Sequence, residues 1–244
     1  MGTAIMVTSG KGGTGKTTLT AGVASCLAAL GHRVLCLDLD IGLRNLDIAL
    51  GLADRAVMDF GDVMAQRCPL LTAAVEHPDI QGLSLLTAPL SLNQPDEGAF
   101  RAMVAEAKDN FDFVFMDSPA GLGLGFQLAM AAADRAILVS ATDPAALRDA
   151  QMAVSHLVGQ VDPIHLVMNR VQPKLIGKLR TTIDHAMDAA GLPLLGLVPE
   201  DQRVTLAAAS GVPVVLIGRK GACPAYLNIA RRLLGRKAPL LHIR

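Results

Sequence analysis

A segment close to the amino terminus has the residue types and the spacing that phosphate binding requires. From Gly10 to Thr17 the sequence reads GKGGTGKT and fits the pattern G-x-x-x-x-G-K-[ST]. The glycines allow the backbone to curl so that successive N–H groups point into one concavity. An apolar run precedes the loop and a helical pattern follows it, so the helix dipole would add to the attraction for phosphate. The segment therefore predicts a nucleotide-binding site.

Side chains of the same loop add charge and a metal ligand. Lys16 is expected to reach the β- and γ-phosphates, the Thr17 hydroxyl to bind Mg²⁺, and Thr18 to hydrogen-bond the α-phosphate. A second lysine, Lys11, can extend toward phosphates of its own chain or across a dimer interface, or it can be an ordinary solvated side chain. ATP and Mg²⁺ are thus the expected ligands. The loop residues expected to contact the nucleotide are Gly10, Lys11, Gly12, Gly13, Thr14, Gly15, Lys16, Thr17 and Thr18.

Carboxylates follow two of the apolar runs. Asp38 and Asp40 come after the run at residues 33–37, and Asp117 comes after the run at residues 113–116. In parallel sheets ligands bind at the carboxyl ends of the strands, so these side chains are expected to face the phosphate loop. There Asp117 would act on Mg²⁺, as the aspartate after such a strand does in other phosphate-loop enzymes. The alternative is that these aspartates only form turns.

The elements that must position these residues can be read from the hydrophobic pattern. Most apolar runs are continuous rather than alternating, as is typical of strands buried on both faces. Strands are expected over residues 4–8, 33–37, 83–87, 113–116, 136–140, 165–168 and 194–198. Helices are expected over residues 17–30, 97–108, 124–132, 144–158, 177–190, 202–210 and 223–234. This order predicts an α/β fold of the P-loop NTPase class, with a mostly parallel twisted sheet of about seven to eight strands and helices on both faces.

Local signals support these boundaries. Gly31 and Gly191 follow expected helices as C-terminal caps, and Asp143 with Pro144 forms an expected helix start. No linker or low-complexity segment divides the chain, so residues 1–244 are expected to form one domain, with 235–244 as a short basic tail.

The composition narrows the class of protein. The formal net charge is zero, which gives no global electrostatic reason to bind nucleic acid. The four cysteines are scattered without a C-x-x-C pair, which argues against a zinc or iron–sulfur site and fits reduced thiols in a cytoplasm. Every apolar stretch is interrupted within helix length, so no segment is expected to span a bilayer. Residues 219–244 are the exception to the charge balance, because they include seven Lys or Arg and no Asp or Glu; such a tail is either a solvated helix end or a contact for phosphate-rich surfaces.

Four motifs in order resemble one known family. They are KGGTGKT from Lys11, DLDIGLRNLD from Asp38, DSPAG from Asp117 and VPEDQ from Val198. Together they resemble the ParA/MinD ATPases with a deviant Walker A motif, and within them the MinD branch of division-site proteins. The resemblance extends from Met1 to about residue 234.

This resemblance implies a catalytic cycle. ATP-bound chains would form a homodimer in which Lys11 of each chain reaches the nucleotide of the other. Asp40 would orient the attacking water, Asp38 and Asp117 would support Mg²⁺, and Lys16 would stabilise the transferring phosphoryl group. Intrinsic ATP hydrolysis would be slow, because fast hydrolysis would not allow the ATP-bound dimer to persist.

The resemblance also implies contacts beyond the phosphates. The expected adenine-binding residues are Asn169, Pro199, Glu200 and Asp201. The expected partners are a MinC-like division inhibitor and a MinE-like or other topological factor. The surface expected to receive them near the dimer seam includes Arg44, Asn45, Arg148 and Asp149.

Two related functions stay open at this stage. One is DNA or cargo partition of the ParA type. The basic tail favours this function. Residues 41–45 count against it, since ParA relatives carry a sequence similar to Pro-Gln-Gly at this place. The other is regulation of flagellar number by an FlhG-like protein. The tail also departs from the MinD pattern, because Pro239 and the five residues after it cannot form an amphipathic membrane helix. We therefore expect a cytoplasmic protein, with weak contact between the tail and anionic lipid on the inner face of the cell membrane as the alternative.

Overall fold

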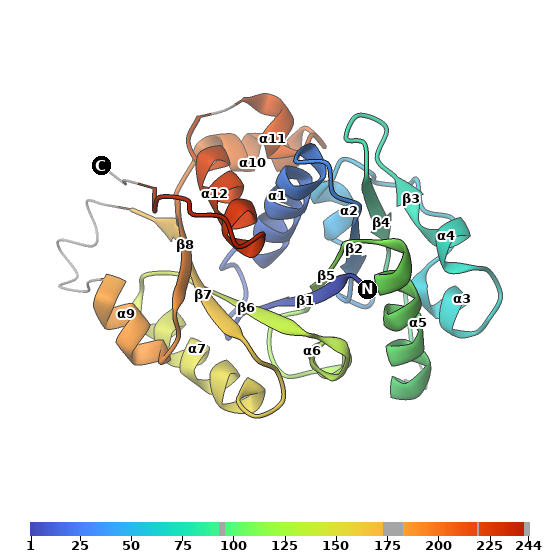
Figure 1. Ribbon diagram of the computed structural model, residues 1–244, viewed down its shortest axis with the longest axis horizontal. Helices are drawn as coiled ribbons and strands as arrows, with labels where there is room; N and C mark the ends of the chain where they lie inside the picture. The colour runs from blue at the N-terminus through green and yellow to red at the C-terminus, as the bar shows by residue number, and fades with distance from the viewer. Residues whose placement is uncertain (93–95, 173–182, 219, 242–244) are drawn as a thin grey trace.

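The computed structural model describes residues 1–92, 96–172, 183–218 and 220–241, and its centre is a twisted sheet of eight strands (Figure 1). The strand order is β3-β4-β2-β5-β1-β6-β7-β8. Neighbouring strands are parallel except β3, which runs antiparallel to β4 at one edge. The strands are β1 (Thr3–Thr8), β2 (Val34–Asp38), β3 (Val75–Glu76), β4 (Leu83–Leu86), β5 (Phe113–Asp117), β6 (Arg135–Ser140), β7 (Ile164–Val171) and β8 (Leu194–Pro199).

Helices cover both faces of the sheet (Figure 1). On one face α1 packs against α12, and α2, α10 and α11 lie beside them. On the other face lie α5, α6, α7 and α9, with α3 and α4 next to α5. The helices are α1 (Lys16–Ala29), α2 (Leu46–Ala49), α3 (Phe60–Met64), α4 (Leu70–Ala73), α5 (Glu97–Asn110), α6 (Leu124–Ala132), α7 (Pro144–Leu157), α9 (Ile183–Ala190), α10 (Gln202–Ala209), α11 (Val214–Ile217) and α12 (Cys223–Leu233).

Two hydrophobic cores result from this layering, and β1 contributes to both. Ile5 and Val7 point into the core beneath α1 and α12, whereas Ala4 and Met6 point into the core beneath α5 and α6. All four side chains are buried. A strand with cores on both faces has no solvent-facing positions, which is why its sequence is continuously apolar.

The expected fold class is confirmed, and so are the seven expected strands and their order along the chain. Within the described residues the structure adds β3 and four helices of four or five residues, namely α2, α3, α4 and α11. These elements are too short to produce a periodic pattern. Gly31 and Gly191 have φ values of 92° and 64°, as expected for helix C-terminal caps. The Asp143 side chain accepts a hydrogen bond from the Ala146 N–H and so caps α7. Of the helix expected over 177–190, residues 177–182 lie outside the described residues.

The chain after α12 folds back onto its own helix. The Asn228 side chain donates to the Pro239 carbonyl at 3.0 Å, and the Arg232 guanidinium donates to the Ala238 carbonyl. Leu241 packs against the core beneath α1 and α12. In the described parts of the chain, no helix combines the length and the apolar character needed to cross a bilayer.

The contact between α1 and α12 depends on a glycine. A Cβ atom at Gly22 would lie 2.6 Å from the Tyr226 ring, closer than carbon atoms can approach. The ring is almost fully buried and rests directly on the backbone of α1. Here glycine is required for close approach, although it is a weak helix former.

Replacing this glycine is expected to loosen the packing of α12. Gly22→Ala should lower the free energy of unfolding by about 1–3 kcal/mol, because the Tyr226 ring has to move away. Chemical denaturation measures the change. Gly98→Ala in α5 is a suitable control, since its nearest neighbour is only a side-chain oxygen, of Asp96, at 3.2 Å. Equal stability of Gly22→Ala and the wild type would contradict the packing argument.

Candidate nucleotide-binding site

The phosphate loop connects β1 to α1 at the carboxyl edge of the sheet. Gly13 and Gly15 have φ values of 78° and 87°, in the left-handed region that favours glycine. Within the described residues, the N–H groups of Gly12, Gly13, Thr14 and Gly15 donate no hydrogen bond to the protein. The first N–H groups of α1 have no intrahelical acceptor either. A row of unsatisfied donors at a helix N-terminus is a ready site for phosphate oxygens.

Lys16 begins α1 and is the buried cation of the site. Its side chain is only slightly exposed, and this burial lowers the pKa of the amine. The charges of Asp117 and Asp40 oppose the shift and favour the ammonium form. A buried ammonium needs an anionic partner, and a bound phosphate would supply one.

Asp117 ends β5 and receives two hydroxyl groups from α1. Thr17 Oγ1 donates to one carboxylate oxygen at 2.7 Å, and Thr20 Oγ1 donates to the other at 2.9 Å. Burial raises the pKa of Asp117 to about 6, although both hydroxyl groups and the Lys16 charge favour the ionised form. The two threonines are three residues apart and so lie on one face of the helix.

Asp38 ends β2 directly beside Asp117, because the two residues are paired in register. Its carboxylate accepts the N–H groups of Asp40 at 2.8 Å and Leu46 at 3.0 Å. Burial raises the pKa of Asp38 to about 7, and the neighbouring Asp117 charge adds to the shift. Asp40 is less buried, and its carboxylate accepts a hydrogen bond from the Asn45 amide at 3.3 Å.

These oxygens fit the requirements of a Mg²⁺ site. Thr17 and Asp117 are already in contact, and Asp38 lies on the adjacent strand. Mg²⁺ prefers oxygen ligands and is usually held by one or two carboxylates together with substrate phosphates. Burial disfavours the charged carboxylates in the absence of a cation, so a divalent ion would lower the free-energy cost of ionising them.

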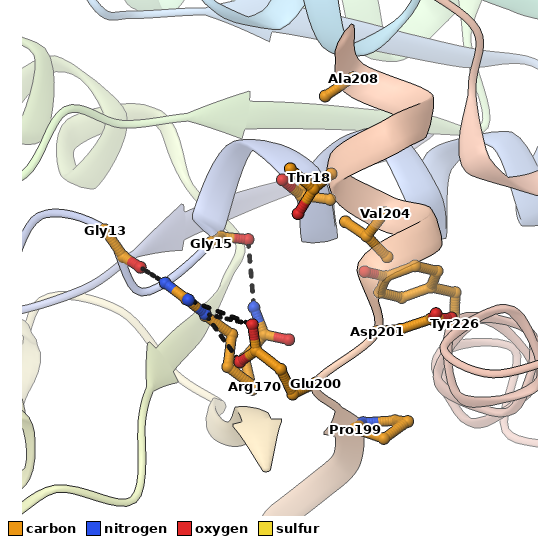
Figure 2. A pocket seen from close by; sticks show the side chains of 12 residues that line it. Gly13, Gly15, Thr18, Arg170, Pro199, Glu200, Asp201, Val204, Ala208 and Tyr226 are labelled. Carbon is orange, nitrogen blue, oxygen red and sulfur yellow. Dashed lines mark hydrogen bonds and ion pairs between the residues drawn. The ribbon is translucent and has the colours of Figure 1, made fainter. Parts of the chain in front are cut away.

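A cavity of about 320 Å³ opens on the other side of the loop, large enough for a small ligand (Figure 2). All four residues expected to bind adenine line it, together with loop residues and the Tyr226 ring. They do so in different ways. The Asn169 amide donates to the Thr14 carbonyl at 2.7 Å, which fixes the loop from behind. The Asp201 carboxylate caps α10 and accepts the Ala222 N–H, so it organises the wall. The lining residues are Gly13, Gly15, Thr18, Asn169, Arg170, Pro199, Glu200, Asp201, Val204, Thr205, Ala208 and Tyr226.

Lys11 extends toward Asp143, the residue that caps α7. Its amine lies 3.9 Å from an Asp143 carboxylate oxygen, and about half of each side chain is exposed. A pair this open contributes little stability, so the lysine can leave it readily. Gly10, at the start of the loop, sits so close to α7 that a Cβ atom would overlap the Asp149 carbonyl.

The expected partner surface is only partly open. Arg148 and Asn45 are exposed. Arg44, by contrast, is turned into its own chain, where its guanidinium donates to the Ala88 carbonyl at 2.6 Å and pairs with Asp59 at 3.2 Å. Asp149 is half-buried beside the loop. Arg44 is thus engaged within its own chain, and its contact with a partner stays a prediction.

Two residues at this site were missed in the sequence. Thr20 could have been found, because it lies one helical turn after Thr17 and must share its face. Arg170 could not, since its contact with Gly13 arises from a local irregularity in β7.

The two buried carboxylates predict how stability depends on pH in the protein without Mg²⁺ or nucleotide. Both folded pKa values lie above the unfolded value near 4, so from about pH 4 to about pH 7 the folded state retains protons that the unfolded state releases. The free energy of unfolding should therefore fall as the pH rises through this window, by at most about 1.4 kcal/mol per pH unit for each proton, and then level off. Denaturant titrations across the window should show this fall, and Asp38→Asn should make it shallower, because only Asp117 then contributes. The same profile in Asp38→Asn and wild type would contradict the assignment, and Asp54→Asn on the surface serves as the control.

Comparisons with known proteins agree with this geometry. Residues 5–214 match the CobQ/CobB/MinD/ParA nucleotide binding domain. The septum site-determining protein MinD of Bacillus subtilis is 39% identical over an alignment of 248 positions, which covers 98% of this chain and 92% of the relative. The MinC:MinD cell division protein complex of Aquifex aeolicus is similar with a TM-score of 0.92 and 35% identity, covering 99% of each chain. MinD of Pyrococcus horikoshii, solved with Mg-ADP, is similar with a TM-score of 0.83 and 28% identity, covering 96% of each chain. The chain therefore belongs to the CobQ/CobB/MinD/ParA family of nucleotide-binding proteins, in its MinD branch.

Proposed function

We propose that this chain is an ATP-hydrolysing dimerisation switch that places the division site by recruiting a MinC-type division inhibitor. The observation that carries the proposal is the arrangement at the sheet edge. The loop has unsatisfied N–H groups, the buried Lys16 begins the next helix, and the Thr17–Asp117 pair lies on that helix and the adjacent strand, while Lys11 is half-exposed beside Asp143. The similarity to a MinD that was solved in complex with MinC supports the choice of partner.

The residues of one chain can perform most of the proposed hydrolysis. The loop N–H groups and Lys16 would hold the phosphates and stabilise the charge that develops during phosphoryl transfer. Asp40 is the most accessible of the three carboxylates and is suited to orient the attacking water. Thr17, Asp38 and Asp117 would hold Mg²⁺, which neutralises phosphate charge when it is bound.

Lys11 is the residue that would make the reaction depend on a second chain. Its amine is half-exposed and only weakly paired, so it can extend across an interface toward the partner's nucleotide. A γ-phosphate contacted from both chains stabilises the dimer only while it is present. Hydrolysis then releases the pair, and slow hydrolysis keeps the switch on for long enough to recruit an inhibitor.

Lys11→Ala is expected to retain nucleotide and lose the ATP dimer. Light scattering should show wild-type dimers with ATP and monomers with ADP, whereas the variant should stay monomeric with both. Nucleotide affinity should fall only a few-fold, because the loop N–H groups and Lys16 remain. Lys237→Ala replaces an exposed lysine of the tail and should dimerise normally. ATP dimers of Lys11→Ala would refute the cross-chain role.

DNA partition of the ParA type is the second candidate, since the chain has a basic segment after residue 219. Part of this charge is already engaged, because Arg232 donates to the Ala238 and Leu195 carbonyls. We expect the ATP form to capture its cognate MinC-type inhibitor and to show no ATP-dependent retention on duplex DNA. Pull-down with ATP or ADP, with DNA as a competitor, measures both. DNA retention that requires ATP and falls steeply with salt would favour partition instead.

A further inference from the structure

An irregularity in β7 brings two consecutive side chains to the phosphate loop. The pairing of β7 with β8 shifts register between Met168 and Val171, and Arg170 within this bulge has a φ of 55°. Side chains of consecutive residues normally point to opposite faces of a sheet. Because of the bulge, Asn169 and Arg170 both reach the loop. A non-glycine residue in the left-handed region is uncommon, and such residues cluster at functional sites.

The two side chains hold three successive carbonyl groups of the loop. The Asn169 amide donates to the Thr14 carbonyl at 2.7 Å and to the Gly15 carbonyl at 3.4 Å. The Arg170 guanidinium donates to the Gly13 carbonyl at 3.1 Å. Figure 2 shows Arg170 between Gly13 and Glu200, next to the cavity.

The carbonyl and the N–H of one trans peptide point in opposite directions. A Gly13 carbonyl held on the outside of the loop therefore turns the Thr14 N–H toward the inside. The same holds for the next two peptides, which orient the N–H groups of Gly15 and Lys16. A loop with glycine at positions 12, 13 and 15 has little stiffness of its own, so this orientation has to be imposed by other parts of the chain.

Glu200 fixes the guanidinium in the required direction. Its carboxylate accepts hydrogen bonds from Arg170 Nε at 3.0 Å and from Nη2 at 3.1 Å, which leaves Nη1 for the Gly13 carbonyl. The backbone of Glu200 is held in turn, because its N–H donates to the Val171 carbonyl at 3.0 Å. Only the planar fork of arginine can serve both acceptors at once.

We propose that Arg170 is a positioning residue of the phosphate loop, aligned by Glu200 and acting through the Gly13 carbonyl. This assignment rests on the proposed nucleotide binding and adds to it a mechanism that orients the loop. The pair is half-exposed, so its contribution to overall stability is small and its effect is on loop geometry. The rival explanation is that Arg170 itself contacts the nucleotide, since it lines the cavity.

Nucleotide titrations of matched variants test the proposal. Arg170→Met should weaken ADP and ATP binding by the same factor, on the order of tenfold, which corresponds to the loss of one charge-assisted hydrogen bond. Arg170→Lys should be almost as weak, because a lysine keeps the charge without the fork. Glu200→Gln should also weaken binding, and the double variant Arg170→Met with Glu200→Gln should be no weaker than Arg170→Met alone. The melting temperature without nucleotide should stay close to that of the wild type.

Three results would overturn the assignment. Wild-type affinity in Arg170→Met would exclude any role in binding. Unchanged or tighter binding in Glu200→Gln would mean that Glu200 does not align the guanidinium and that Arg170 binds the nucleotide directly. An equal loss in Arg101→Met, which breaks an exposed pair with Glu97 on α5, would mean that the effect is not specific to the loop. Failure of the wild type to bind ADP or ATP would instead refute the proposed function itself.

Discussion

The site depends on one constraint, which is that two buried carboxylates lie beside a glycine-rich loop and a buried lysine. Asp38 and Asp117 end the adjacent parallel strands β2 and β5 and are paired in register. On its other side β5 pairs with β1, and Lys16 begins the helix that follows β1. Burial makes ionised carboxylates costly, and their closeness increases this cost. A cation shared between these oxygens and a phosphate would satisfy both sides, so the ligand completes a set of charges that the protein balances only in part. The parallel sheet is the means of bringing them together, because all its central strands end at this edge.

The sequence was informative wherever one local rule determined the outcome. The loop from Gly10 to Thr17 combines glycine spacing, a preceding strand and a following helix, and each of these is visible in neighbouring residues. The continuous apolar runs predicted seven buried strands because a strand between two cores has no polar face. Asp38 and Asp117 could be placed near the loop because parallel strands end at one edge. The roles assigned to single residues in the reaction remain predictions.

The parts that the sequence did not reveal depend on contacts between distant residues. The contacts of Arg44 with the Ala88 carbonyl and with Asp59 are one example, because neither acceptor is marked by any local pattern. The expected contact of Arg44 with a partner stays a prediction. Asn169 and Asp201 were expected to bind adenine, and both also make contacts within the protein. Asn169 donates a hydrogen bond to a carbonyl of the phosphate loop, and Asp201 caps α10. The bulge at Arg170 breaks the twofold alternation on which strand predictions rest, so no spacing rule could have placed that side chain. Tertiary packing decided all three.

The contact between Gly22 and Tyr226 joins α1 directly to α12. The amino end of α1 follows the phosphate loop, and its middle packs against α12 through the Tyr226 ring, which lies on the backbone of Gly22. The segment after α12, as far as residue 241, is held against α12 through Asn228 and Arg232. The phosphate loop, α1, α12 and this segment therefore form one continuous series of packed elements, with a single aromatic ring at its middle.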